Sequence, residues 1–196
     1  MLDVVALVSD TFSRTLTEEY RRAYGSTAGP YIEIMDAASR MAIERIGASD
    51  ASYHNFEHTM LVTQVGWDIL KGKRLHAKVD AQDAAHFLLA CLFHDIGYVR
   101  GICSGDGGDT VVINEAGDTI KWPRGASDAF LAPYHVDRSK LFIRERAALT
   151  DLLDGERMAR AVELTRFPVP VDDDHPETDT EAGLVRAADL IGQLAD

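Results

Sequence analysis

Two residues that can bind a metal ion, His94 and Asp95, come directly after an apolar run, Phe87 to Phe93. Such a run is typical of a buried element, so the chain carries an ionisable pair toward the interior of the protein. A buried carboxylate without a partner costs several kcal/mol or gives up its charge. A metal ion is one of the few partners that satisfies a carboxylate and an imidazole together. The dipeptide therefore predicts a metal site.

Further candidate ligands stand on both sides of this pair in the sequence. His54 and His58 are four residues apart, a spacing that places two side chains on one face of a helix. Asp189 lies among apolar neighbours near the C-terminus, much as Asp95 does. A pair of histidines at this spacing is weak evidence by itself. Together the segments supply a mixed nitrogen and oxygen site that suits a divalent ion: Mn, Fe, Zn, Ni or Mg.

The order of these residues resembles that of a known superfamily. His58, then His94-Asp95, then Asp189 follow the H…HD…D signature of the HD-domain metal-dependent phosphohydrolases. Residues 53–58 read YHNFEH, which is similar to the YHNxxH motif of the cyclic-nucleotide phosphodiesterases within that superfamily. The resemblance implies an all-α fold, a helical bundle like that of the phosphodiesterases.

The resemblance, which spans about residues 53–189, also implies roles for single residues. It implies that the four residues of the signature bind the metal and that His54 protonates the leaving oxygen. Asp95 is expected to orient the attacking water or to bridge to a second ion. Those phosphodiesterases carry another histidine four residues after the HD histidine, where this chain has Tyr98. One metal site is therefore expected, and a second stays open.

These features predict a hydrolase that cleaves a phosphomonoester or phosphodiester, with a nucleotide as the expected substrate. The metal would activate a water molecule, and His54 has a near-neutral intrinsic pKa that suits a general acid. Two alternatives stay open. One is a ligand-binding or regulatory HD module that keeps the metal without catalysis. The other is an HD-fold di-iron oxygenase, which needs additional histidine ligands and is disfavoured by Tyr98.

A basic segment supplies candidate substrate-binding residues in an otherwise acidic chain. It comprises His135, Arg138, Lys140 and Arg144, and Arg100 follows closely after the HD pair. Arginine offers a planar fork of donors that matches phosphate oxygens. An exposed basic face that is paired with neighbouring acidic residues explains the segment equally well.

Helical periodicity covers most of the chain and would position these residues. Asp80 is a plausible N-cap of the helix that leads to His94. The expected helices are an N-terminal one around Val4 to Phe12, then Pro30–Gly47, Asn55–Leu70, Ala81–Ile96, Lys140–Leu153, Glu156–Arg166 and Glu181 to the end.

Periodicity disappears between Gly101 and Pro133, where glycines accumulate. Two β-branched runs, residues 110–113 and 119–122, flank a segment of turn composition, residues 114–118. This pattern predicts a small β-hairpin in the loop. Long loops in compact domains are usually functional.

Composition limits the class of protein. A chain of 196 residues with 46% hydrophobic residues can bury one core, so residues 1–196 are expected to form a single HD domain. The formal charge of −12 argues against nucleic acid as a partner but allows a small phosphorylated substrate.

No segment approaches the roughly 20 uninterrupted apolar residues of a membrane-spanning helix, so a membrane is not expected as a partner. Cys91 and Cys103 form no disulfide framework, which fits a cytoplasmic location. The last helix has no stop signal before Asp196, so either it frays there or the natural chain continues. The oligomeric state stays open.

Overall fold

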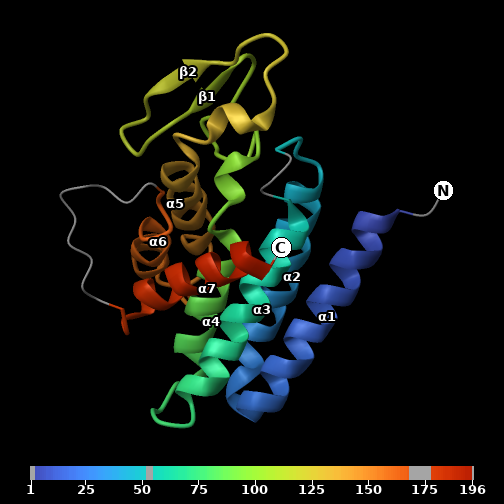
Figure 1. Cartoon of the computed structure of the whole chain (residues 1–196), viewed down its shortest axis with the longest axis vertical. Coiled ribbons are helices and arrows are strands. Elements are labelled where there is room, and N and C mark those ends of the chain that lie inside the picture. Colours follow the sequence, from blue (N-terminus) through green and yellow to red (C-terminus); the bar gives the residue numbers. More distant parts are fainter. Residues whose placement is uncertain (1–2, 52–54, 168–177, 196) are drawn as a thin grey trace.

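The computed structural model describes residues 3–51, 55–167 and 178–195. Within them the protein is a bundle of α-helices with a small two-stranded sheet at one end (Figure 1). The predicted all-α fold with a small hairpin is confirmed. No helix in the described part of the chain is both long and apolar enough to cross a membrane. The α-helices are α1 (Val4–Tyr24), α2 (Gly29–Gly47), α3 (Phe56–Lys73), α4 (Ala81–Phe93), α5 (His135–Ala147), α6 (Gly155–Glu163) and α7 (Glu181–Ala195).

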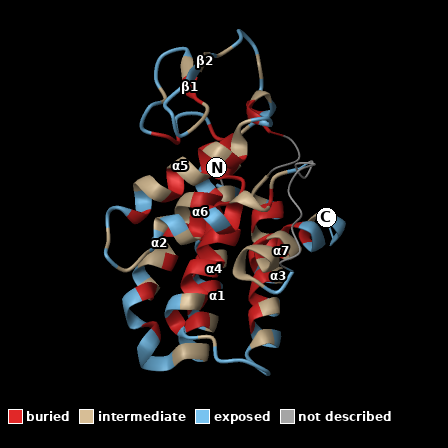
Figure 2. Cartoon of the chain, turned by 90° about the vertical axis from the view of Figure 1, so that its left-hand side faces the viewer, coloured by how far each residue is buried: buried red, intermediate tan, exposed pale blue. Residues whose placement is uncertain are grey.

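Helix α4 lies at the centre of the bundle. It is apolar on all sides, is buried throughout residues 84–93, and contacts α2, α3, α6 and α7. Figure 2 shows the buried residues running through the middle of the helical body. A helix that is apolar all round is expected in a core. The ionisable pair that follows it is therefore buried too: His94 is 1% exposed and Asp95 is 5% exposed.

Polar caps fix where three of the helices begin. Asn55, Asp80 and Asp154 precede α3, α4 and α6, and each side chain accepts a hydrogen bond from the third backbone N–H of its helix, over 3.0, 2.8 and 2.9 Å. Such caps satisfy amides that have no partner within the helix. The N-cap predicted at Asp80 is confirmed.

The end of α4 differs from the prediction. The helix ends at Phe93 instead of Ile96, because Asp95 leaves the helical region with φ −105° and ψ 3°. A short 3₁₀ turn, η2 (Ile96–Tyr98), follows. The backbone therefore changes direction at the residues that carry the predicted chemistry.

The bounds of α5 were also predicted wrongly. The helix begins at His135 instead of Lys140 and ends at Ala147 instead of near Leu153. Residues 148–154 form the connection to α6, whose start is capped by the side chain of Asp154. The earlier start brings His135 into a regular helical position.

The predicted hairpin is confirmed. Strand β1 (Thr110–Val112) pairs antiparallel with β2 (Thr119–Lys121). The Nδ2 of Asn114 donates to Oδ2 of Asp118 over 2.8 Å, and the amide of Asp118 donates to Oδ1 of Asn114 over 3.1 Å. Gly117 between them has φ +80°, a conformation that favours glycine.

A fully buried arginine ties the hairpin to the helical body. The two terminal nitrogens of Arg138 on α5 donate to both carboxylate oxygens of Asp106, over 2.9 and 2.8 Å, and its guanidinium also donates to the carbonyls of Gly97 and Val99. Burial alone would raise the pKa of Asp106, but the bonds and charge of Arg138 hold it below its ordinary value. The pair is thus an internal anchor between α5 and the hairpin loop.

Candidate metal centre

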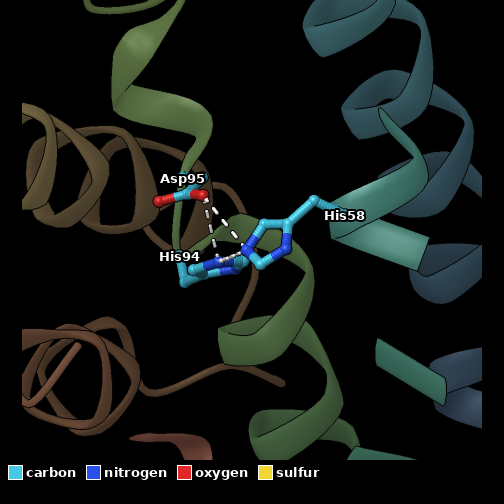
Figure 3. A group of neighbouring side chains, drawn as sticks. All are labelled: His58, His94 and Asp95. Carbon is cyan, nitrogen blue, oxygen red and sulfur yellow. Dashed lines mark hydrogen bonds and ion pairs between the residues drawn. The ribbon is translucent and has the colours of Figure 1, made fainter. Parts of the chain in front are cut away.

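Three predicted ligands meet in a buried cluster (Figure 3). His58 comes from the first turn of α3, and His94 and Asp95 follow α4. The two Nε2 atoms are 3.3 Å apart, and Oδ2 of Asp95 lies 3.6 Å from Nε2 of His58 and 3.2 Å from Nε2 of His94. The structure therefore brings together residues that are 36 positions apart in the sequence.

The fourth predicted ligand, Asp189, reaches the same cluster from α7. Its Oδ1 lies 3.3 Å from Nε2 of His58 and 3.6 Å from Nε2 of His94. Helix α7 can approach α3 closely because residue 192 is a glycine: a Cβ at Gly192 would lie 2.7 Å from the side chain of Val62. Close helix packing one turn after Asp189 thus positions its carboxylate.

Local contacts orient the imidazole of His94 and fix the position of His58 on α3. Nδ1 of His94 lies 2.7 Å from the carbonyl oxygen of Cys91. Because a carbonyl only accepts, Nδ1 donates its proton to this carbonyl, and Nε2 is the ring nitrogen that faces the cluster. His58 occupies the third position of α3, where its amide donates to the capping side chain of Asn55. The cap therefore fixes both the start of the helix and the place of this ligand.

The donor atoms of His58, His94 and Asp95 are close enough together to hold one divalent cation. Nitrogen and oxygen ligands lie about 2.1 Å from such an ion, which puts neighbouring ligands about 3.0 Å apart in an octahedron and about 3.4 Å apart in a tetrahedron. The separations measured between the imidazole nitrogens and the carboxylate oxygens are 3.2 to 3.6 Å. The cluster could hold a metal ion after small side-chain adjustments.

Protonation in the metal-free protein reflects the same electrostatics. Burial alone would lower the pKa of His94, but Asp95 and Asp189 outweigh it and hold the pKa well above its ordinary value. Burial alone would raise the pKa of Asp189, but hydrogen bonds from His58 and His94 lower it to about 2. Positive charge in the cluster is therefore favoured, and a metal ion would compete with a proton for the same place.

The second oxygen of Asp95 faces a different neighbour. Its Oδ1 lies 3.7 Å from Nε2 of His135, whose Nδ1 is 2.6 Å from the carbonyl oxygen of Ala132. The ring of Tyr98 stacks on the imidazole of His135, with the centroids 4.4 Å apart. His135, predicted to bind substrate, thus lies at the edge of the metal cluster, together with Tyr98.

This juxtaposition depends on a close approach between η2 and α5. A Cβ at Gly97 would lie 1.9 Å from the carbonyl oxygen of His135. The amide of Gly97 donates to Oγ of Ser139 over 2.9 Å, and that hydroxyl donates to the carbonyl of His94 over 2.7 Å. The position of His135 beside Asp95 could not be read from the sequence, because it requires this contact between helices.

Two other predicted residues lie elsewhere. His54, the predicted general acid, lies outside the described residues. Arg100 points toward the hairpin: its Nε donates to Oδ1 of the buried Asp128 over 2.7 Å, and its guanidinium lies 4.4 Å from the ring centroid of Trp122. Arg100 is therefore not part of the His58-His94 cluster.

The basic residues of α5 have intramolecular partners. Arg138 is wholly buried against Asp106. Lys140 pairs with Glu163 over 2.7 Å, and Arg144 pairs with Glu115 over 2.6 Å. The expected phosphate-binding face thus coincides with an ion-pair network, and a role of these residues in substrate binding stays a prediction.

Comparison with known proteins places the chain in a family. No curated protein matches it, and no solved structure matches it either. One family matches almost the whole chain, over residues 2–196. The protein belongs to the Npun_R2479-like family.

Proposed function

We propose that this protein is a metal-dependent phosphohydrolase that cleaves a phosphomonoester or phosphodiester of a small molecule, with a nucleotide as the expected substrate. The observation that carries the proposal is the convergence of two imidazole nitrogens and a carboxylate oxygen within 3.6 Å of one another, in a buried site beside Asp189. The order of these residues in the chain resembles the HD signature, which supports the same reading.

The donor set favours a transition metal. Two imidazoles and two carboxylates suit Mn, Fe, Zn or Ni, whereas Mg prefers an all-oxygen shell with several waters. The four residues would hold one ion. Oδ1 of Asp95 and Nε2 of His135 face one another at the edge of the site, and whether they support a second ion stays open.

The roles of the residues follow from their orientation. A divalent ion bound here would supply a water of lowered pKa and polarise a phosphoryl oxygen. His58 and His94 direct Nε2 into the site, and Asp95 contributes Oδ2 while its Oδ1 turns toward His135. That oxygen and Nε2 of His135 would orient the attacking water by accepting its hydrogen bonds. His54 would donate a proton to the leaving oxygen.

Substrate binding in this proposal uses the metal site and His135. Arg138 is not used, because its guanidinium is committed to Asp106 and to backbone carbonyls inside the fold. The net charge of −12 favours a small substrate over a polyanion.

We also propose that the protein is cytoplasmic. Cys91 and Cys103 are both free and buried. Burial raises the pKa of the Cys103 thiol to about 12, so it carries little of the reactive thiolate at neutral pH.

The test combines metal analysis with phosphate release. Purified protein is loaded separately with Mn²⁺, Fe²⁺, Ni²⁺ and Zn²⁺, and assayed on a panel of nucleoside monophosphates, cyclic nucleotides and simple phosphate esters. We expect turnover with at least one metal, and its loss in Asp95→Asn. His54→Ala should keep the metal but lose turnover, whereas His76→Ala, which removes an exposed histidine, should change neither.

The outcomes separate the open functions. Bound metal without turnover on any phosphate compound would contradict a phosphohydrolase and favour a ligand-binding module. Loss of metal in His54→Ala would make His54 a ligand. Two iron atoms per chain with oxygen uptake would favour the oxygenase.

A further inference from the structure

A pocket lies next to the hairpin, away from the metal cluster. It has a volume of about 610 Å³ and is lined only by residues between Arg100 and Arg124. This volume is in the range of small-molecule sites, about 300–1,000 Å³. None of the predicted metal ligands His58, His94, Asp95 and Asp189 lines it. The pocket is therefore distinct from the site of the proposed chemistry.

The charged groups of this pocket favour an anion. Its lining includes three cations, Arg100, Lys121 and Arg124, and two acids, Asp106 and Asp109. Both oxygens of Asp106 are already bonded to Arg138, which neutralises this acid from inside the fold. Asp109 pairs with Lys121 over 3.0 Å, but both side chains are largely exposed, so the pair is weak and can rearrange.

Arg124 contributes an uncompensated positive charge. It is exposed, and no acidic residue in the described ranges forms an ion pair with it. In a chain with a net charge of −12, an unpaired cation in the lining of a pocket attracts a small anion.

Arg100 is held in a fixed orientation at the same wall. Its Nε donates to Asp128, whose carboxylate also accepts from Oγ of Ser49 over 2.7 Å. Its guanidinium lies against the ring of Trp122, which packs edge-on against Phe130. Within residues 3–51, 55–167 and 178–195, no group accepts a hydrogen bond from the two terminal nitrogens of Arg100. They form a pre-oriented fork of donors.

Two glycines line part of the pocket without side chains. Gly101 and Gly108 line the pocket with φ of +72° and +59°, and a Cβ at either position would meet no atom within 4 Å. The backbone can turn there without a side chain filling the space. A ligand can therefore approach the main chain closely.

We propose that this pocket binds the oxyanion group of a small organic molecule, a phosphate or a carboxylate, through Arg100 and Arg124, at a site separate from the metal centre. The volume exceeds that of a free phosphate ion, so the rest of the ligand would lie along the hairpin. The proposal does not depend on phosphohydrolase activity.

Tryptophan fluorescence provides a direct readout. Trp122 lines the pocket, whereas Trp67, the other tryptophan, is 3% exposed in the helical body. Metal-free protein is titrated with pyrophosphate, and in a separate arm with citrate, at constant ionic strength. We expect a saturable change in emission that Trp122→Phe abolishes. The probe that saturates the signal at the lower concentration shows whether the pocket prefers a phosphate or a carboxylate.

Variants test the residues. Arg100→Gln and Arg124→Gln should each weaken binding about tenfold, as the loss of a charged hydrogen bond implies. Arg14→Gln, which removes an exposed cation on α1, and Asp95→Asn should bind as the wild type does. Circular dichroism confirms that each variant is folded.

Three results would overturn the proposal. They are the absence of a saturable signal with either probe, unchanged affinity in both arginine variants, or loss of binding in Asp95→Asn. The last would place the anion at the metal centre. Phosphate release is measured separately, so failure here leaves the proposed function unaffected.

Discussion

The metal cluster and the basic segment of α5, residues 138–144, both gather charged groups, but the fold treats the two sets differently. Along α5 every one of the three candidate cations meets a carboxylate, as Arg138 meets Asp106. In the cluster two carboxylates and two imidazoles converge, and a positive charge is needed among them. Residue type alone therefore does not mark a site. It is more informative to ask which charged groups the fold leaves without a partner of opposite sign.

The contrast is sharpest for Arg138. Because it is fully buried, Arg138→Met would leave Asp106 as a buried acid without its partner. Breaking a buried pair in this way costs about 3–5 kcal/mol, so we expect the largest loss of stability here. Urea unfolding of the metal-free protein measures it. A change below about 1 kcal/mol would mean that the anchor is not formed.

Gly97 tests the contact that brings α5 to the cluster. Gly97→Ala places a methyl group 1.9 Å from the carbonyl oxygen of His135, so η2 or α5 must shift. Overpacking of this kind costs about 1–3 kcal/mol. Gly72→Ala, where a Cβ would meet nothing, is the matched control for thermal unfolding. Equal melting temperatures for the two variants would contradict the close approach.

Acid should weaken the Arg138 anchor. The pKa of Asp106 is lowered in the folded protein, so the carboxylate stabilises the fold above its unfolded pKa of about 3.9, and this contribution is lost as the pH falls toward the folded pKa. The difference in free energy of unfolding between the wild type and Asp106→Asn should therefore be largest at about pH 6 and should decrease below about pH 4. A difference that is independent of pH would refute this linkage.

The smallest effect is expected on the surface of α5. Arg144 is partly exposed and pairs with the exposed side chain of Glu115, and such surface pairs contribute about 0–1 kcal/mol. The free energy of unfolding of Arg144→Ala should therefore lie within about 1 kcal/mol of that of the wild type. The difference should be smaller still at high salt, because salt screens the ion pair. A loss as large as that of Arg138→Met would erase the distinction between the two arginines.

The sequence predicted the features that depend on local chemistry. Asp80 was identified as an N-cap, and the hairpin followed from two β-branched runs around a turn. His94 and Asp95 stood out because an ionisable pair after an apolar helix is unusual. These signals are local, so tertiary packing did not need to be known.

The features that the sequence did not reveal depend on packing between distant segments. Nothing in the sequence distinguishes the buried Arg138 from the partly exposed Arg144. The approach of His135 to Asp95 requires the contact of Gly97 with α5. Single-domain organisation and the HD resemblance stay predictions, and His54 lies outside the described residues.

The most direct test of the central claim is calorimetric titration of the metal-free protein with Mn²⁺. We expect one ion per chain for the wild type, and a loss of affinity of more than about 100-fold in His94→Ala and Asp95→Asn, because even the loss of a residue that only supports a ligand costs about 10–100-fold. Glu57→Gln, which alters an exposed acid beside His58, should bind normally. Absence of binding by the wild type, or equal affinity in all variants, would contradict the assignment of this cluster as a metal centre.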